Sequence, residues 1–236
     1  MTVRKTRQQT QESPDYTEEQ SVLQSLDVPA LVIGLDEAGR GPWAGPVVAG
    51  AAWLNPQDCP QDLLTQLNDS KKLSAKRRES LFERMEELSS EEKSPLLWST
   101  GSASVEEIDE INILQASFLS MRRAKDALLE QLGLRFPNHK VLALVDGNKD
   151  PNLSLPVRTL VKGDGRSLSI AAASICAKVL RDREMSHLAE LYPGYAFEKN
   201  QGYGTKDHQN GLAKLGVCPA HRLTFRPVKE RLEVSN

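Results

Sequence analysis

The chain has few of the features that mark secreted, membrane-bound or thiolate-metal proteins. Its 236 residues include only three cysteines, with no C-x-x-C spacing, which argues against a disulfide framework and a zinc site. No stretch approaches the roughly 18 apolar residues of a membrane span. The N-terminus also lacks the apolar centre of a signal peptide. We therefore expect a cytoplasmic protein without a membrane partner.

A large excess of one charge is also lacking, because 30 basic residues stand against 32 acidic ones and the net charge is −2. This balance argues against a protein that simply coats nucleic acid. The distribution is uneven, since residues 68–78 carry five bases and one acid, and residues 199–231 carry seven bases and two acids. Solvated helix faces would explain either run alone. Two such runs in a chain with clustered acids favour a phosphate-bearing substrate held against a metal site.

The length is sufficient for one α/β domain with a sizeable core. Residues 1–28 are rich in Gln, Thr, Glu and Ser and have hardly any apolar periodicity, which predicts a disordered tail. No internal repeat and no Pro/Gly-rich linker divides the remainder. Residues 29–232 are therefore predicted to form a single domain.

Apolar periodicity predicts the order of helices and strands. Buried strands are expected over residues 31–36, 46–54, 96–103, 140–146 and 156–161. Helices are expected over residues 74–88, 104–133 and 167–192, the second with a capping box of Ser104 and Glu107. Short turns favour antiparallel pairing of the first strands, whereas helical connections require parallel pairing of the later ones. The order predicts an α/β fold with a mixed central sheet flanked by helices, followed by a small C-terminal helical and loop region.

Carboxylates stand at the ends of two predicted strands. Asp36 and Glu37 end the first strand, Asp146 ends a later one, and Asp164 precedes the last long helix. A lone Asp-Glu pair would ordinarily be a solvated strand end, but a second acid at a second strand end counts against that. Because neighbouring strand residues point to opposite faces, Asp36 and Glu37 can converge only if the strand ends there. Ligands of open α/β sheets bind at this edge.

Four carboxylates without suitably spaced His or Cys describe a site of hard oxygen ligands, which suits Mg²⁺ or Mn²⁺ rather than zinc. Surface or core roles are expected for the histidines, which are His139, His187, His208 and His221. The glycines that follow the first acids have the wrong spacing for a dinucleotide fingerprint and no Walker loop is present. No nucleophile elbow is evident either. Acids, a divalent ion and flanking bases indicate phosphoryl-transfer chemistry.

A series of motifs spans residues 30–230. In order they are "GLDEAGRGPWAGPVVAGA", "NDSKKLS", "INILQASFLSMRRA", "LVDGN", "VKGDGRSLSIAAASICAKVLRDREM", "YPGY", "GYGTKDH" and "HRLTFRPV". In content and order they resemble ribonuclease HII, the bacterial type 2 ribonuclease H family. The resemblance implies a ribonuclease H-like fold and metal-dependent endonucleolytic cleavage of the RNA strand of RNA–DNA hybrids. It also implies cleavage 5′ to single ribonucleotides in duplex DNA, leaving a 3′-hydroxyl and a 5′-phosphate.

The resemblance implies roles for individual residues. The acids that bind Mn²⁺ or Mg²⁺ and act in catalysis correspond to Asp36, Glu37, Asp146 and Asp164. The substrate-binding positions correspond to Gly39, Arg40 and Gly41 at the ribose 2′-hydroxyl, Tyr203 on the following deoxyribose, and Lys71 at a phosphate. The chain departs from the family pattern at Asn200 and Gln201, where basic or histidine residues are common, and at Trp43, which replaces a small or aliphatic residue.

Two other classes of function stay open at this point. One is a non-catalytic module that binds RNA–DNA hybrids, against which the intact set of acids argues. The other is a nuclease of the same fold that acts on DNA alone, which the Gly39-Arg40-Gly41 motif and Tyr203 disfavour. The expected partners are RNA–DNA hybrids and ribonucleotide-containing duplex DNA, bound by a monomer that acts in DNA repair.

Overall fold

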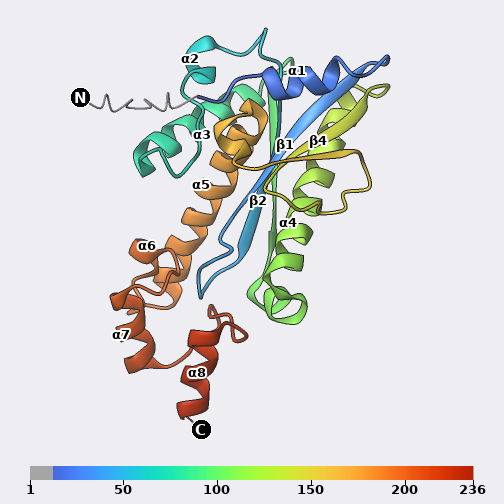
Figure 1. Ribbon diagram of the computed structural model, residues 1–236. Helices are drawn as coiled ribbons and strands as arrows, with labels where there is room; N and C mark the ends of the chain where they lie inside the picture. Colours follow the sequence, from blue (N-terminus) through green and yellow to red (C-terminus); the bar gives the residue numbers. More distant parts are fainter. Residues whose placement is uncertain (1–12, 236) are drawn as a thin grey trace, which may run out of the picture.

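The computed structural model describes residues 13–235 (Figure 1). The strands are β1 (Ala30–Ala38), β2 (Val47–Leu54), β3 (Leu96–Ala103), β4 (Lys140–Asp146) and β5 (Val157–Leu160). The helices are α1 (Thr17–Leu23), α2 (Gln61–Leu64), α3 (Ala75–Ser89), α4 (Val105–Arg135), α5 (Leu168–Leu191), α6 (Phe197–Asn200), α7 (Lys206–Leu215) and α8 (Arg226–Ser235), with a 3₁₀ turn, η1, at Gly163–Gly165. All predicted strands and long helices are present, with ends that differ by a few residues.

The strands form one mixed sheet in the order β3-β2-β1-β4-β5. β2 pairs antiparallel with both β1 and β3, whereas β4 pairs parallel with both β1 and β5. β4, which pairs parallel with β1, follows the long helix α4, as the sequence predicts. The simple link between connection and pairing fails elsewhere, because β2 and β3 pair antiparallel across a connection that contains α2 and α3, and β4 and β5 pair parallel with no helix between them. The predicted fold class is nevertheless confirmed.

Helices cover both faces of the sheet (Figure 1). Alternate residues of β1, namely Leu31, Ile33 and Leu35, pack with the apolar side of α4. The opposite face packs against α5, and α3 lies against α5 on that side. Because both faces are buried, the strands are apolar on both sides, which is why they read as continuous apolar runs in the sequence.

One predicted helix is broken. The segment from Val105 to Arg135 contains a residue with non-helical dihedral angles, Asn112, at φ 67° and ψ 160°. The Asn112 side chain accepts hydrogen bonds from the backbone N–H groups of Leu114 and Gln115. It thus acts as a second N-cap inside the helix, because a short amide side chain replaces the missing backbone partners. The helix also runs two residues past Gly133, where the predicted helix ends.

The prediction of a disordered tail is wrong for the described part of residues 1–28. Thr17–Leu23 form α1, and Val22 packs in a cluster with Val32 and Leu144 of the sheet. The carboxylate of Glu19 is fully buried. The segment is ordered by a few specific polar contacts and a short apolar face, which composition does not reveal. Residues 1–12 lie outside the described residues.

The C-terminal helices lie beyond the end of α5, next to the turn between β1 and β2 (Figure 1). Two backbone contacts join them to this turn, an isolated bridge between Ala44 and His221 and a hydrogen bond from Trp43 N–H to Gly202 O (2.8 Å). Within residues 13–235 the three cysteines are free thiols. No helix in this part of the chain is both long and apolar enough to cross a membrane.

Candidate active site

A cavity of about 430 Å³ opens where β1 passes into the turn before β2. Seven of the nine predicted site residues line it, and they are Asp36, Glu37, Gly39, Arg40, Gly41, Lys71 and Tyr203. The other two, Asp146 and Asp164, lie near enough for their charges to act on Asp36. The structure therefore brings together residues that are up to 167 positions apart in the sequence.

The acids on β1 converge on one site for a different reason from the predicted one. β1 does not end at Asp36 but runs on to Ala38, paired with β2. Its parallel partner β4 is the strand that ends, because the β1–β4 pairing stops at Leu35 and Val145. From Asp36 onward β1 has one open edge, which allows the acids to adjoin Asp146.

Two of these acids already have hydrogen-bond or ion-pair partners within the chain. Asp36 is buried, and its Oδ1 accepts the backbone N–H of Glu37 at 2.7 Å. The Glu37 carboxylate forms an ion pair with Arg40 at 3.0 Å. Burial raises the pKa of Asp36 well above its usual range, and the negative charges of Glu37 and Asp146 raise it further. Burial also raises the pKa of Glu37, although Arg40 opposes this shift.

Asp146 and Asp164 are joined through one turn. Asp146 Oδ1 accepts the backbone N–H of Gly163 at 2.6 Å, and the next residue is Asp164, in the turn η1. Burial raises the pKa of Asp164 to about 6, together with the charges of Asp69 and Asp146. Asp69 is a fifth acid that the sequence analysis did not single out. Its signal was present, because it lies in the quoted motif that supplies Lys71.

Lys71 faces this group of acids. Partial desolvation of the amine disfavours its charged form, but the negative charges of Asp36, Asp164 and Asp69 outweigh that effect and raise the pKa of Lys71. Lys71 and Arg40 together do not balance four or five acids. An added cation would relieve the remaining repulsion, and oxygen-only donors fit Mg²⁺ or Mn²⁺.

The donors are near one another but not assembled around one point. Among residues 13–235, no three His, Cys, Asp or Glu side chains form a group that could hold a metal ion as they stand. Glu37 is held by Arg40 and Asp146 by the N–H of Gly163. The chemistry of the donor set therefore fits a divalent cation, whereas its binding requires these side chains to exchange partners.

The predicted ribose-reading residues lie together at the cavity rim. Gly39 has φ +97°, and a Cβ there would lie 1.9 Å from Nε of Arg181, so that only glycine fits. A Cβ on Gly41 would lie 3.3 Å from Cε1 of Tyr203, which places the tyrosine ring against this glycine. Tyr203 is half exposed. A half-exposed aromatic ring beside an open backbone is suited to contact with a sugar.

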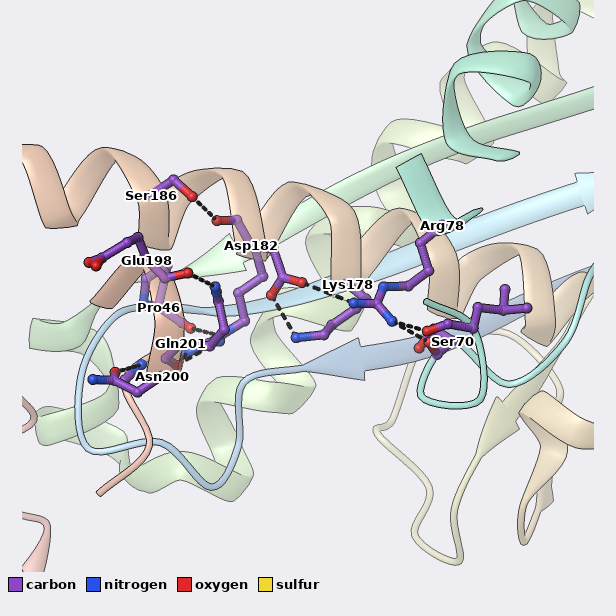
Figure 2. A network of polar contacts seen from close by, with 12 residues as sticks. Pro46, Ser70, Arg78, Lys178, Asp182, Ser186, Glu198, Asn200 and Gln201 are labelled. Carbon is purple, nitrogen blue, oxygen red and sulfur yellow. Dashed lines mark hydrogen bonds and ion pairs between the residues drawn. The ribbon is translucent and has the colours of Figure 1, made fainter. Parts of the chain in front are cut away.

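Three basic residues that line the cavity were not predicted, and they are Arg78, Lys178 and Arg181. Figure 2 shows Asp182 of α5 between Lys178 and Arg78, at 2.6 and 3.5 Å. Arg78 also donates to the carbonyl of Ser70, the residue before Lys71, at 2.8 Å (Figure 2). These contacts fix the loop that carries Lys71. Lys178 and Arg181 lie in a quoted motif and Arg78 in the basic run of residues 68–78, but nothing in the sequence gave the direction of their side chains.

Solved structures of the same fold are ribonucleases H. The structure matches the ribonuclease H2 of Pyrococcus horikoshii OT3 with a TM-score of 0.62, over 86% of this chain and 98% of that one, at 25% identity. It matches a Bst ribonuclease HIII solved in complex with Mn²⁺ with a TM-score of 0.65, over 89% and 72% of the two chains, at 18% identity. The second likeness is one of fold alone. Fold and site together define a ribonuclease H hydrolase.

The family follows from sequence similarity. The family model described as ribonuclease HII matches residues 33–228. A ribonuclease HII of Paramagnetospirillum magneticum is 50% identical over 205 residues, which are 87% of this chain and 94% of that protein. The chain belongs to the ribonuclease HII family. The resemblance found in the ordered motifs is thereby confirmed.

Proposed function

We propose that the protein is a metal-dependent endonuclease that hydrolyses the RNA strand of RNA–DNA hybrids and cuts duplex DNA 5′ to single ribonucleotides. The observation that carries this proposal is the single cavity lined by acids, bases, the glycine turn and Tyr203. Membership of the ribonuclease HII family supports it. The products are a 3′-hydroxyl and a 5′-phosphate.

Asp36, Glu37, Asp146 and Asp164 are the residues proposed to hold Mg²⁺ or Mn²⁺. When bound, such ions neutralise charge on the scissile phosphate and activate the attacking water. Burial of Asp36 and the repulsion among the acids favour uptake of a cation. Ligation of an ion by Glu37 would free Arg40, whose side chain is half exposed, to contact the substrate.

The remaining residues of the cavity bind and orient the duplex. Lys71 neutralises a phosphate, and the pull of the neighbouring acids keeps it charged. Backbone groups of Gly39, Arg40 and Gly41 meet the 2′-hydroxyl, which distinguishes ribose from deoxyribose. The ring of Tyr203 packs on the next sugar, where a hydroxyl would crowd it. Together these contacts select a ribonucleotide that is followed by a deoxyribonucleotide.

We further propose that residues 29–232 form the catalytic domain and that the protein acts as a monomer in the cytoplasm, in removal of ribonucleotides from DNA. A repair role follows from the proposed substrate. The gathering of seven of the nine site residues in one cavity of a single chain supports the proposed monomer.

The test uses three matched duplexes that carry one ribonucleotide, a full RNA strand, or DNA alone. With Mg²⁺ or Mn²⁺, the first should be cut once, 5′ to the ribonucleotide, the second at many positions, and the third not at all. End-labelling both strands and mapping the cut identifies the termini. Binding without cleavage would favour a hybrid-binding module instead, and cleavage of the all-DNA duplex would favour a DNA nuclease.

A further inference from the structure

The turn that joins β1 to β2 is built around a buried arginine from the far end of the chain. Arg222 is fully buried, and its side chain lies inside the curve of residues 39–46. Its guanidinium donates to the carbonyl oxygens of Gly39 (2.6 Å), Pro42 (2.8 Å), Gly45 (2.9 Å), Arg40 (3.1 Å) and Pro46 (3.2 Å). All three of its nitrogens bond to this turn.

Such an arrangement has an energetic cost. Within the described chain, no carboxylate forms an ion pair with Arg222, so its charge is buried against neutral carbonyls. Burial and the nearby Arg181 lower the pKa of Arg222 to about 9. Phe225 stacks on the guanidinium at 5.0 Å. An apolar side chain would fill the same space at lower cost, but it would leave these carbonyls without partners and free to turn outward.

The direction of the carbonyls fixes the direction of the amides. In a trans peptide, the C=O of one residue and the N–H of the next point to opposite sides, and no cis bond occurs in residues 13–235. Because the carbonyls of Gly39 and Arg40 point at Arg222, the N–H groups of Arg40 and Gly41 point away from it. Both residues line the active-site cavity, and Gly41 adjoins the ring of Tyr203.

We propose that Arg222 is a positioning residue for ribose recognition, which turns the N–H groups of Arg40 and Gly41 into the cavity as donors to the 2′-hydroxyl. This inference rests on the proposed function, since it explains how the glycine turn is held ready to read ribose. Without the guanidinium, the two peptides rotate and the donors are lost, while the acids stay in place. Arg222 therefore affects the choice of sugar rather than the hydrolytic step.

Arg181 connects the same turn to the segment that carries Tyr203. It donates to the carbonyls of Pro46 (3.1 Å) and Ala44 (3.2 Å), and twice to that of Gln201 (both 3.1 Å). Pro46 and Gln201 lie close together in Figure 2. The turn and the tyrosine are thus fixed relative to each other, so that the two contacts to successive sugars are made as one unit.

The test measures the coupling between Arg222 and one hydroxyl group of the substrate. The affinity for two fluorescent duplexes that differ only in one 2′-hydroxyl is measured in EDTA, which prevents cleavage. Three proteins are compared: wild type, Arg222→Lys and the control Arg135→Lys. Arg135 also donates to a backbone carbonyl, that of Ser94, but near the opposite end of β1. Wild type and control should prefer the ribonucleotide duplex. Arg222→Lys should lose about tenfold of this preference, the equivalent of one hydrogen bond, with unchanged affinity for DNA.

The other possible results of this binding test contradict either the role of Arg222 or ribose recognition itself. A wild-type preference that persists in Arg222→Lys would refute the positioning role and leave the proposed function standing. Absence of any preference in wild type would refute ribose reading itself, and the positioning role with it. If Arg222→Lys does not fold, amide exchange in wild type decides. The N–H groups of Arg40 and Gly41 should be protected by the ribonucleotide duplex and not by DNA, and equal protection would contradict the proposal.

Discussion

The two ends of the described chain each hold one part of the site, and they do so with opposite chemistry. The N-terminal segment, residues 13–28, places Glu19 against the start of α5. There the carboxylate accepts hydrogen bonds from Ser167 Oγ (2.6 Å), Ser169 Oγ (2.7 Å) and Ser169 N–H (2.9 Å). The C-terminal segment, residues 216–235, places Arg222 inside the glycine turn, where the guanidinium only donates.

The difference lies in what each contact leaves free. A carboxylate orients donors, so Glu19 uses up the N–H and O–H groups next to the Asp164 turn and fixes that turn as a rigid part of the fold. A guanidinium orients carbonyls, so Arg222 leaves the amides on the other side of each peptide available. We therefore expect the N-terminal contact to govern stability and the C-terminal contact to govern recognition of the substrate.

The largest loss of activity is expected from substitution of the acids. This loss is the value with which the effects of the two terminal segments are compared. Asp36→Asn should lower the cleavage rate by at least on the order of 10²–10³-fold, because it removes one proposed metal ligand. The fold should persist, since the change relieves repulsion in a buried acidic group. Binding of the duplex should persist or tighten. Single-turnover cleavage and duplex affinity check this, and near-normal turnover in saturating Mg²⁺ would contradict it.

Substitution of two neighbouring acids, Glu19 and Glu18, tests whether the N-terminal segment governs stability. Glu19→Ala should lower the free energy of unfolding by about 3 kcal/mol, because it removes the buried acceptor shared by Ser167 Oγ, Ser169 Oγ and Ser169 N–H. Glu18→Ala is the matched control, since Glu18 pairs with Arg158 and Arg166, which are half exposed. Its removal should cost about 1 kcal/mol or less. Chemical denaturation measures both.

The preference for a ribonucleotide over DNA should stay unchanged in Glu19→Ala. A loss of that preference equal to the loss in Arg222→Lys would remove the distinction between the two segments.

The C-terminal side also carries a pair of buried histidines that predicts a pH dependence of stability. His208 and His221 are buried, with their Nε2 atoms 3.0 Å apart, and His208 Nδ1 donates to the carbonyl of Tyr203 at 3.0 Å. This pattern requires neutral rings, because a proton on both facing nitrogens would repel. Burial, together with the charge of His208, lowers the pKa of His221 from 6.5 to about 4.

The sign follows from linkage. Above pH 6.5 both folded and unfolded His221 are neutral, so that the full stability is present. As the pH falls toward 4, only the unfolded form takes up the proton, and about 3 kcal/mol of stability is lost. The loss between pH 7 and pH 4 should be smaller by that amount in His221→Asn than in wild type. An identical loss in both proteins would show that His221 titrates normally.

The smallest effect is expected at Lys71, which neither end of the chain contacts. Lys71→Ala should weaken binding to all duplexes about equally and lower the slope of log affinity against log salt by about one unit. Lys76→Ala, on the exposed start of α3 and outside the cavity lining, is the control. Fluorescence titrations over a range of salt concentrations measure the slope. An unchanged slope in Lys71→Ala would return this lysine to the class of solvated surface residues.

The sheet and its acids could be predicted because their signals are local. The apolar runs, the short turns and the acids at strand ends each depend on residues that are neighbours in the sequence. The detail that failed concerns the partner strand. The convergence of Asp36 and Glu37 with Asp146 depends on where β4 ends, and no pattern within β1 contains that information.

The contacts of the two buried charged residues, Arg222 and Glu19, could not be predicted because they join segments that are distant in the sequence. Arg222 was counted in a basic run and assigned to the substrate, although it is fully buried. Glu19 was counted in a polar tail, although it reaches Ser167 and Ser169, about 150 positions away. In both cases the residue type predicts exposure, and only a partner from another part of the chain reverses that expectation.

Equilibrium binding of Mn²⁺ tests most directly whether the acids at the ends of β1 and β4 form a metal site. Isothermal titration calorimetry is carried out on wild type and on the Asp36→Asn, Asp146→Asn double variant, with no nucleic acid present. Wild type should bind the ion saturably, and the double variant should bind it at least tenfold more weakly while it retains its fold by circular dichroism. Equal affinity of the two folded proteins for Mn²⁺ would contradict the proposed metal site.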